Sequence, residues 1–219
     1  MGLDWQPLWL TLKLAFITSF SLLLIGLLLA ALLFRFRSRL TVVLENMVTL
    51  PLVLPPVVLG FYLLLLFSPQ SFLGAWLHTL FDYRLIFTFP GLVVASVIYS
   101  LPFMAQPLLA GLRSIPRAIH EALATLGKGY VQSFVHVYLP MIKPQIAIGV
   151  LMSFAHTLGE FGVVLIIGGN IPGETKVASI AIYEAIETLN YPLAHRYALI
   201  LFLFSFVATW LLQRLQRHA

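Results

Sequence analysis

The sequence predicts an all-α polytopic membrane protein with about five transmembrane helices, in a single domain that spans residues 1–219. Of the 219 residues, 60% are hydrophobic and only 10% are charged, whereas soluble domains average about 25% charged residues. Five apolar runs have the length that a bilayer crossing requires, roughly 20 residues. The predicted class follows from this composition and from the lengths of these runs.

The five predicted spans are separated by polar loops. They cover residues 8–33, 47–67, 89–110, 141–169 and 193–212. Two further segments, 71–83 and 177–189, have a helical pattern but are short, and either is a candidate sixth helix. The first run is too long for a signal-peptide core and has no obvious cleavage site, so we expect it to be retained.

Lysine and arginine in the loops predict the orientation, because cytoplasmic loops carry an excess of both. One set of loops carries eight such residues: Arg35, Arg37, Arg39, Arg113, Arg117, Lys128, Arg214 and Arg217. The opposite set carries three: Arg84, Lys176 and Arg196. We therefore expect an external N-terminus, a cytoplasmic C-terminus and a cytoplasmic loop at 113–140. In a membrane protein the net charge of +5 is no indication of nucleic-acid binding.

The loop 113–140 is the longest stretch that is neither strongly apolar nor a short turn. A helix is predicted to begin near Pro116 and to end at Gly127, a residue type that closes helices in the left-handed conformation. Apolar residues recur along it at helical spacing: Ala118, Ile119, Ala122, Leu123 and Leu126. This helix either packs on its own bundle or docks on a partner, with Glu121 available to pair with a cation.

Prolines interrupt two of the predicted spans. Pro51, Pro55 and Pro56 fall in the second span, where each interior proline removes a backbone hydrogen bond. The interruption is either a kink that packs on another helix or a broken helix that lines a pathway. Pro102 and Pro107 predict a second kinked helix, with Gln106 as a candidate lining residue.

The fourth span contains the polar residues Ser153, His156, Thr157 and Glu160. His156 and Glu160 lie four apart, so one helix face would hold both close enough to pair. Ionisable groups at membrane depth usually face a bundle interior or water, so these residues either gate a pathway or form a pair that fixes packing. Gly159 and Gly162 would allow a second helix to approach closely. No third ligand stands nearby, so no metal site is predicted.

Three stretches resemble the permease subunits of ABC importers. The loop carries Glu121-Ala122-Leu123, then Gly127, then Val137-Tyr138-Leu139-Pro140. This spacing is similar to the family's EAA loop, EAA-x3-G-x9-I-x-L-P, with Leu123 in place of alanine and Val137 in place of isoleucine. The stretches LPLVLPPVVLG and LGEFG, the latter followed by GNIPGET with Asn170 and Pro172 in an external loop, resemble the membrane subunit of bacterial molybdate importers. Sulfate and thiosulfate permeases look similar, and His156 stands where an arginine is common.

The resemblance implies a type I importer permease fold in which Glu121, Ala122, Gly127, Leu139 and Pro140 couple the chain to an ATPase. It implies a homodimer in the inner membrane, a dimer of ATP-binding subunits and an extracytoplasmic oxyanion-binding protein. Molybdate or tungstate would cross by alternating access, with ATP and Mg on the partner and no cofactor on this chain. The absence of a G-x4-G-K-[ST] motif agrees with a transport subunit that is not itself an enzyme.

Two other functions remain as alternatives. A sulfate or thiosulfate permease would share the same loop and fold. An ion-coupled secondary transporter would use His156 and Glu160 as a proton relay, although no inverted repeat is visible in the sequence. An integral-membrane enzyme with these two residues as an acid–base pair is disfavoured, because no nucleophile accompanies them.

Overall fold

The computed structural model describes residues 3–36, 38–82 and 84–216, which form helices and turns without a β-strand in these ranges. Arg37 and Arg217 of the orientation argument lie outside them. The elements in chain order are α1 (Gln6–Arg35), α2 (Arg39–Thr49), the 3-10 turn η1 (Leu50–Leu52), α3 (Pro56–Phe67), α4 (Phe72–Phe81), α5 (Phe89–Ser114), α6 (Arg117–Thr125), α7 (Tyr130–Ser133), the π-helical turn η2 (Phe134–Tyr138), α8 (Leu139–Met141), α9 (Lys143–Leu158), α10 (Gly162–Gly168), α11 (Ala178–Glu187) and α12 (Tyr191–Gln216). The predicted all-α class is confirmed.

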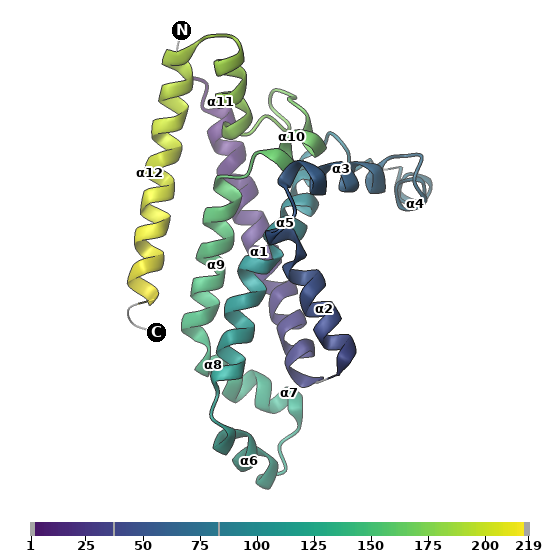
Figure 1. The fold of residues 1–219 in the computed structure, drawn as a ribbon, viewed down its shortest axis with the longest axis vertical. Coiled ribbons are helices and arrows are strands. Elements are labelled where there is room, and N and C mark those ends of the chain that lie inside the picture. The colour runs from purple at the N-terminus through teal and green to yellow at the C-terminus, as the bar shows by residue number, and fades with distance from the viewer. Residues whose placement is uncertain (1–2, 37, 83, 217–219) are drawn as a thin grey trace.

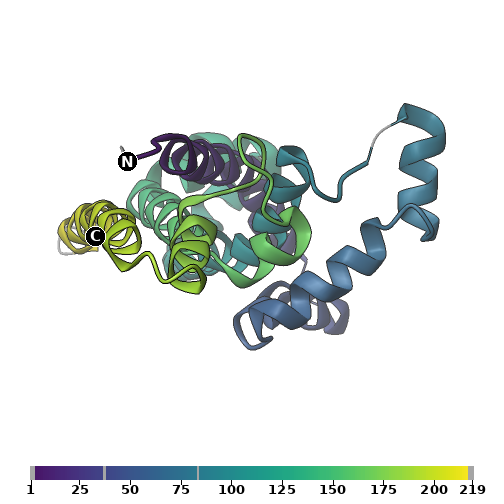
Figure 2. The same ribbon diagram turned by 90° about the horizontal axis from the view of Figure 1, so that it is seen from above.

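Helices α1, α5 and α9 form the centre of the molecule, where each packs against the other two (Figure 1). Helix α12 lies along α9 on one side. Seen from above, α3 and α4 extend from the opposite side as a lateral arm (Figure 2). The segment α6–α8 closes one end of the bundle, and the N-terminus lies at the other end.

Glycines let the central helices approach closely. A Cβ added at Gly26 of α1 would lie 2.5 Å from Met104 Cγ, and one added at Gly149 of α9 would lie 2.9 Å from Met104 Sδ. Met104 itself is fully buried. Small residues at such contacts are typical of packed membrane helices, where close van der Waals contact drives association.

Three helices, α1, α5 and α12, are each long and apolar enough to cross a membrane, and two bent helix pairs raise the candidate number of spans to five. These three helices confirm the predicted first, third and fifth spans. Helix α5 continues through Pro102 and Pro107, and Gln106 is exposed on its surface. The candidate sixth helices, α4 and α11, have 10 residues each, about half of what a crossing needs.

The predicted second span, residues 47–67, is interrupted at its prolines. Helix α2 already begins at Arg39, where Ser38 and Thr41 form a reciprocal capping box. It bends by 113° into α3, which begins at Pro56 with Pro55 as its N-cap. Pro51 has no N–H to continue the hydrogen-bond ladder of α2. Pro55 and Pro56 stand at the start of α3, where a missing N–H is tolerated. The alternative of a broken helix is the one observed.

The prediction of one helix over residues 141–169 is wrong. Helix α9 ends at Leu158 and α10 begins at Gly162. Between them the chain makes short-range turns, with Gly159 N–H donating to His156 O and Glu160 N–H to Thr157 O. The break lets α10 approach α3, since a Cβ at Gly162 would lie 2.8 Å from Pro56 Cβ. The two interrupted segments therefore meet at their breaks.

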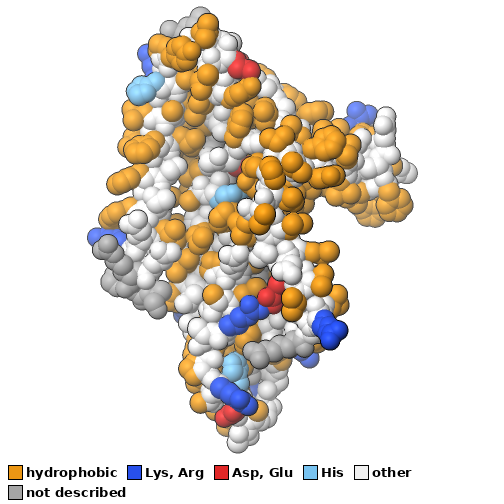
Figure 3. Space-filling view, in the orientation of Figure 1, with side chains coloured by type: hydrophobic (Ala, Val, Ile, Leu, Met, Phe, Trp, Pro, Cys, Tyr) orange, Lys and Arg blue, Asp and Glu red, His pale blue; other side chains and the backbone are white. Residues whose placement is uncertain are grey.

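Hydrophobic side chains cover the middle of the molecule on the face shown in Figure 3, and charged side chains are concentrated toward the α6 end and the upper rim. Helix α12 presents large exposed apolar residues, among them Phe202, Phe206 and Trp210. A wide apolar belt between polar ends is the surface that a bilayer requires.

Candidate transport site and docking loop

Helix α6 forms an exposed unit at the end of the bundle, and its C-terminal end is closed by backbone hydrogen bonds. Gly127 adopts φ +64°, the left-handed conformation that suits a residue without a Cβ. Lys128 N–H donates to Leu123 O and Gly127 N–H to Ala124 O, which is the Schellman arrangement at a helix end. The predicted start near Pro116, which is the N-cap residue, and the predicted end at Gly127 are both confirmed.

The two sides of α6 face different surroundings. Leu123 is buried and Ile119 partly buried against the core cluster at this end of the bundle. Ala118, Ala122 and Leu126 are exposed. The Glu121 side chain is 67% exposed and pairs with Arg117, one turn earlier, at 3.1 Å. The exposed side therefore presents small and apolar residues around one acid, which is a surface suited to a partner.

The second half of the loop anchors the first half to the bundle. Tyr130 Oη–H donates to Ala31 O of α1 at 2.5 Å, and His120 Nδ1 lies 2.7 Å from Tyr138 Oη. Leu139 is partly buried against the core and Pro140 is exposed at the start of α8. Movement of α6 is thereby linked to α1 and to the lower end of α9.

His156 lies in a polar and aromatic setting supplied mainly by α5. Its Nδ1 is 2.9 Å from Ser100 Oγ. Its ring stacks on Phe103, with centroids 4.0 Å apart, and meets Tyr99 at 4.6 Å. These contacts hold the imidazole on the α5 side of α9.

Ser153 and Thr157 are buried on the same part of α9. Thr157 Oγ1–H donates to Ser153 O at 2.9 Å and lies 3.2 Å from Ser100 Oγ. The Ser153 hydroxyl has no hydrogen-bond partner among the described residues. The structure therefore brings together Ser100, His156 and Thr157, and leaves Ser153 as an unused buried donor.

Glu160 is buried, with 4% of its surface exposed, and neither carboxylate oxygen has a hydrogen-bond partner within the described chain. The hydroxyl of Ser96 on α5 lies nearby without hydrogen-bond geometry. The expectation of a His156–Glu160 pair is wrong. That expectation assumed a continuous helix. In the structure the turn at Gly159 separates the two side chains, and His156 forms a hydrogen bond with Ser100 instead.

A cavity of about 520 Å³ joins the two interrupted segments. It is lined by residues from α3, α5 and the α9–α10 break: Pro56, Val57, Tyr99, Ala155, His156, Gly159, Glu160, Phe161 and Gly162. Gly159 is exposed, and a Cβ added there would meet only His156 O, at 3.8 Å, among the described residues. Gly162 makes the close contact with α3. Of the sequence-predicted proline residues, Pro56 reaches this cavity; Pro51 is buried elsewhere and Pro55 is exposed.

The predicted external loop is tied to α11. Asn170 Nδ2–H donates to Glu184 Oε2 at 2.8 Å, and Lys176 Nζ pairs with the same oxygen at 2.5 Å. Both interactions lower the pKa of the Glu184 carboxyl. Pro172 is exposed, and buried Thr175 donates to Gly168 O. Within the described ranges no three His, Asp or Glu side chains gather as a metal site.

Residues missed by sequence reasoning come from two neighbouring helices, α5 and α11. Ser96 and Ser100 lie four apart on α5 and both face the His156–Glu160 segment. Ser179 Oγ–H donates to Glu160 O at 2.7 Å. The spacing of Ser96 and Ser100 in an apolar span is a signal that could have marked them.

A family model described as "Binding-protein-dependent transport system inner membrane component" matches residues 22–219. The chain belongs to this family. Among binding-protein-dependent permeases, it is 44% identical over 214 residues to the "Molybdenum transport system permease protein ModB" of Azotobacter vinelandii, covering 98% of this chain and 95% of that one. It is 36% identical over 206 residues to the "Sulfate transport system permease protein CysT" of Escherichia coli, covering 94% and 74% respectively.

Solved structures show that the fold is that of importer permeases. A chain of the MetNI methionine ABC transporter in an inward-facing form aligns with a TM-score of 0.75 at 18% identity, covering 97% of this chain and 94% of the other. A chain of a bacterial alginate ABC transporter, solved with its periplasmic protein bound, aligns with a TM-score of 0.77 at 19% identity, covering 97% and 78%. The predicted type I permease fold is confirmed.

Proposed function

We propose that this chain is the permease subunit of an ATP-driven importer for molybdate or tungstate, driven by a separate ATPase. The observation that carries the coupling is the exposed face of α6, a capped helix whose other face is fixed to the bundle by Leu123. A helix built in this way can transmit a push from a partner to α1 and α9. The chain itself is a transport subunit.

The substrate class rests on the relatives. A molybdenum permease aligns at 44% identity over nearly the whole chain, and a sulfate permease aligns at 36%. Molybdate, tungstate and sulfate are all tetrahedral dianions, so sulfate is the second candidate. Capture of each anion by the associated external binding protein, measured by calorimetry, would separate them.

We also propose a homodimer, with two ATPase subunits and an extracytoplasmic binding protein, and with the N-terminus outside and the C-terminus in the cytoplasm. The arm formed by α3 and α4 supports the dimer. It leaves the bundle sideways and carries exposed apolar residues such as Val57, Phe61 and Phe72. An apolar arm of this kind is suited to a second copy within the membrane.

The pathway would pass the cavity at the two helix breaks. Irregular backbone at membrane depth is tolerated where it is buried in protein or lines a wet cavity, and this cavity holds both His156 and Glu160. A buried carboxylate repels a dianion. Two like unit charges 4 Å apart repel each other by ~4 kcal/mol at an effective dielectric of 20. The segment Ser153, His156, Thr157, Gly159 and Glu160 is therefore proposed as a gate and not as a tight anion site.

Two variants of α6 test the coupling. Glu121→Lys reverses the charge on its exposed face, and Gly127→Pro removes the left-handed closure, so both should weaken co-purification with the ATPase subunit. Lys128→Gln, next to the closure but outside α6, is the control and should assemble normally. Normal assembly of both test variants at wild-type membrane abundance would refute the docking role.

A further inference from the structure

The helical segment Tyr130–Met141, between α6 and α9, contains one turn of different geometry. Leu139 N–H donates to Phe134 O, five residues earlier. Phe134 N–H before this turn and Ile142 N–H after it donate to carbonyls four residues back. Within the described ranges this turn, η2, is the one π-helical turn. A turn closed over five residues holds one residue more than an α turn, and such turns are frequent at functional sites.

Four residues along this segment are spaced by four and face the core: Tyr130, Phe134, Tyr138 and Ile142. We call these four residues the core stripe. In a regular α-helix of 3.6 residues per turn, each step of four overshoots a turn by about 40°, which amounts to roughly 120° over three steps. The wider turn at η2 offsets this drift and keeps the core stripe on one side.

The two ends of the core stripe are attached to the spans. At the first end, the Tyr130 hydroxyl donates to Ala31 O of α1. At the other end, Ile142 is 1% exposed and lies against α5, since a Cβ added at Gly111 would be 3.2 Å from Ile142 Cγ2. The core stripe therefore connects α1 to α5 through the segment that contains η2.

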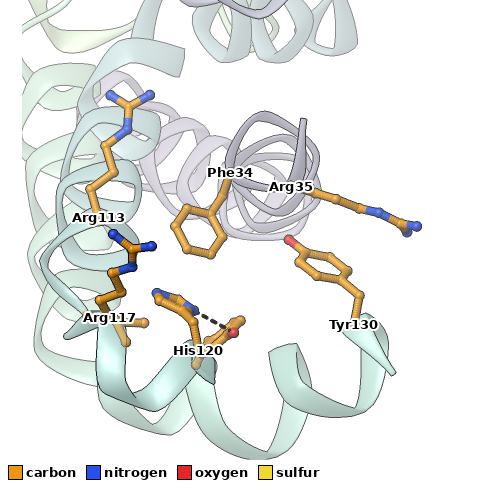
Figure 4. A pocket seen from close by; sticks show the side chains of 8 residues that line it. Phe34, Arg35, Arg113, Arg117, His120 and Tyr130 are labelled. Carbon is orange, nitrogen blue, oxygen red and sulfur yellow. Dashed lines mark hydrogen bonds between the residues drawn. The ribbon is translucent and has the colours of Figure 1, made fainter. Parts of the chain in front are cut away.

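Tyr138, the last residue of η2, connects the core stripe to α6. Its Oη lies 2.7 Å from His120 Nδ1, the hydrogen bond drawn as a dashed line in Figure 4. Phe34 of α1 meets both rings, with centroids 5.8 Å from Tyr138 and 5.7 Å from His120. A displacement of α6 thus acts on the π turn at its last residue.

The segment has room to change its register. Tyr130 and Tyr138 line a pocket of about 740 Å³ at this end of the bundle, the one shown in Figure 4. Val135, within η2, is 49% exposed. Pro140, two residues after η2, has no N–H, so the hydrogen-bond ladder lacks a donor where a regular turn would continue. The register beyond η2 is therefore weakly held.

We propose that η2 is a register switch between α6 and α9. A displacement of α6, acting through His120 and Tyr138, converts the π turn to an α turn. The residues that follow then rotate by the angle of one residue, about 100°, and the surplus residue is taken up at the 74° bend before α9. The switch rests on the proposed docking of α6 on an ATPase and adds the element through which that docking reaches α9.

Deletion of Val135 tests the turn in the purified full-length chain. It changes the spacing of the core stripe from four, four, four to four, three, four, which a regular α-helix keeps on one face. We expect the variant to melt close to the wild-type temperature in neutral detergent. Deletion of Phe20, an exposed residue of the regular helix α1, is the control. It should lower the melting temperature clearly, because it rotates Gly26 away from α5.

Coupling is measured in the assembled complex in proteoliposomes. The Val135 deletion leaves α6 intact, so the ATPase should co-purify, but uptake should be lost while ATP hydrolysis continues. Tyr138→Phe keeps the ring in the core stripe and removes its hydrogen bond to His120, so it should weaken coupling in the same direction. Tyr191→Phe, at an exposed tyrosine of α12, is the control and should couple normally.

Single cysteines report the rotation, because the native chain contains none. Val137 lies within η2 and is partly buried, whereas Val131 lies before η2 and is 71% exposed. Maleimide reactivity of Val137→Cys should change when ATP is added to the complex. The reactivity of Val131→Cys should stay the same.

Three results would each overturn the switch: a loss of stability on deletion of Val135 as large as in the Phe20 control, normal coupling of the Val135 deletion, or reactivity at position 137 that does not respond to ATP. A stable and normally coupled deletion variant would make η2 a structural turn only. Failure of the wild-type chain to co-purify with the ATPase would instead refute the docking proposal, and the switch with it.

Discussion

At the scale of single residues, Glu160 is a buried carboxylate beside the cavity at the two helix breaks. Its carboxylate is buried without a hydrogen-bond partner in the described chain, while its backbone carbonyl is held by Ser179. Burying an unsatisfied polar group costs about 1–3 kcal/mol. A conformation that hydrates or pairs this carboxylate would be favoured by the same amount. In the proposed gate, the residue would therefore bias the balance between conformational states.

Glu160→Gln should shift that balance, because the amide has the same shape without a charge. We expect basal ATPase activity of the assembled complex to rise, by up to about tenfold for a shift of roughly 1.4 kcal/mol, while the binding protein keeps its affinity for the anion. ATP hydrolysis and uptake are measured together in proteoliposomes, with exposed Glu174→Gln as control. Normal uptake with normal coupling would assign Glu160 to packing.

Glu184 makes stability depend on pH at the loop between α10 and α11. Lys176 and Asn170 lower its pKa below the ordinary value of 4.5, so its contribution is present above that value and is lost as pH falls through the lowered pKa. We expect Glu184→Gln to melt below wild type at pH 7, and the difference to shrink as pH falls below about 4.5. Glu174→Gln in the same loop should show no such pH-dependent difference, and a difference that stays constant with pH would contradict the assignment.

At the scale of elements, the positions of the long helices could be predicted because continuous apolar runs determine them. The interruptions of the second and fourth spans were harder to predict. The proline run marked an interruption in the second span but not its start at Arg39, which depends on the Ser38–Thr41 cap. The fourth span was predicted as unbroken because Gly159 and Gly162 also fit helix packing. The hydrogen-bond partner of His156 could not be predicted, because Ser100 lies 56 residues away in the sequence.

The start of α5 should be intolerant of any side chain at position 91. A Cβ at Gly91 would lie 1.7 Å from Leu85 O, whereas nothing lies within 4 Å of one at Gly129. Gly91→Ala should therefore destabilise the protein by about 1–3 kcal/mol, as overpacking does. Gly129→Ala should be near neutral. Thermal unfolding in detergent compares the two variants. Equal melting temperatures would mean that the loop before α5 moves to accommodate the added methyl group without loss of stability.

At the scale of the whole molecule, the two terminal helices start at the same end. Tyr197 Oη–H of α12 donates to Asp4 O, just before α1, at 2.7 Å. Helix α12 then runs away from that end, and α6 lies at the far end (Figure 1). An external N-terminus would therefore place the docking loop on the cytoplasmic side, as the lysine and arginine bias predicts.

Single cysteines test this orientation, because the native chain contains none. Asp4→Cys should react with an impermeant maleimide from the external side of intact cells. Lys128→Cys, after the end of α6, should react only once the membrane is permeabilised. The reverse pattern would invert the topology and remove α6 from the reach of an ATPase.

The 113° bend between α2 and α3 has a consequence for biogenesis. Helix α2 contains Glu45 and Asn46, and the Glu45 side chain pairs with Arg113 at the far end of α5. A nascent chain leaves the ribosome from its N-terminus, so α2 emerges 64 residues before this partner. We expect the second segment to stay outside the bilayer core until α5 has been synthesised. Val48 of α2 is buried in the full chain, so Val48→Cys should react with a water-soluble maleimide in chains truncated before residue 113 and be protected in the full chain.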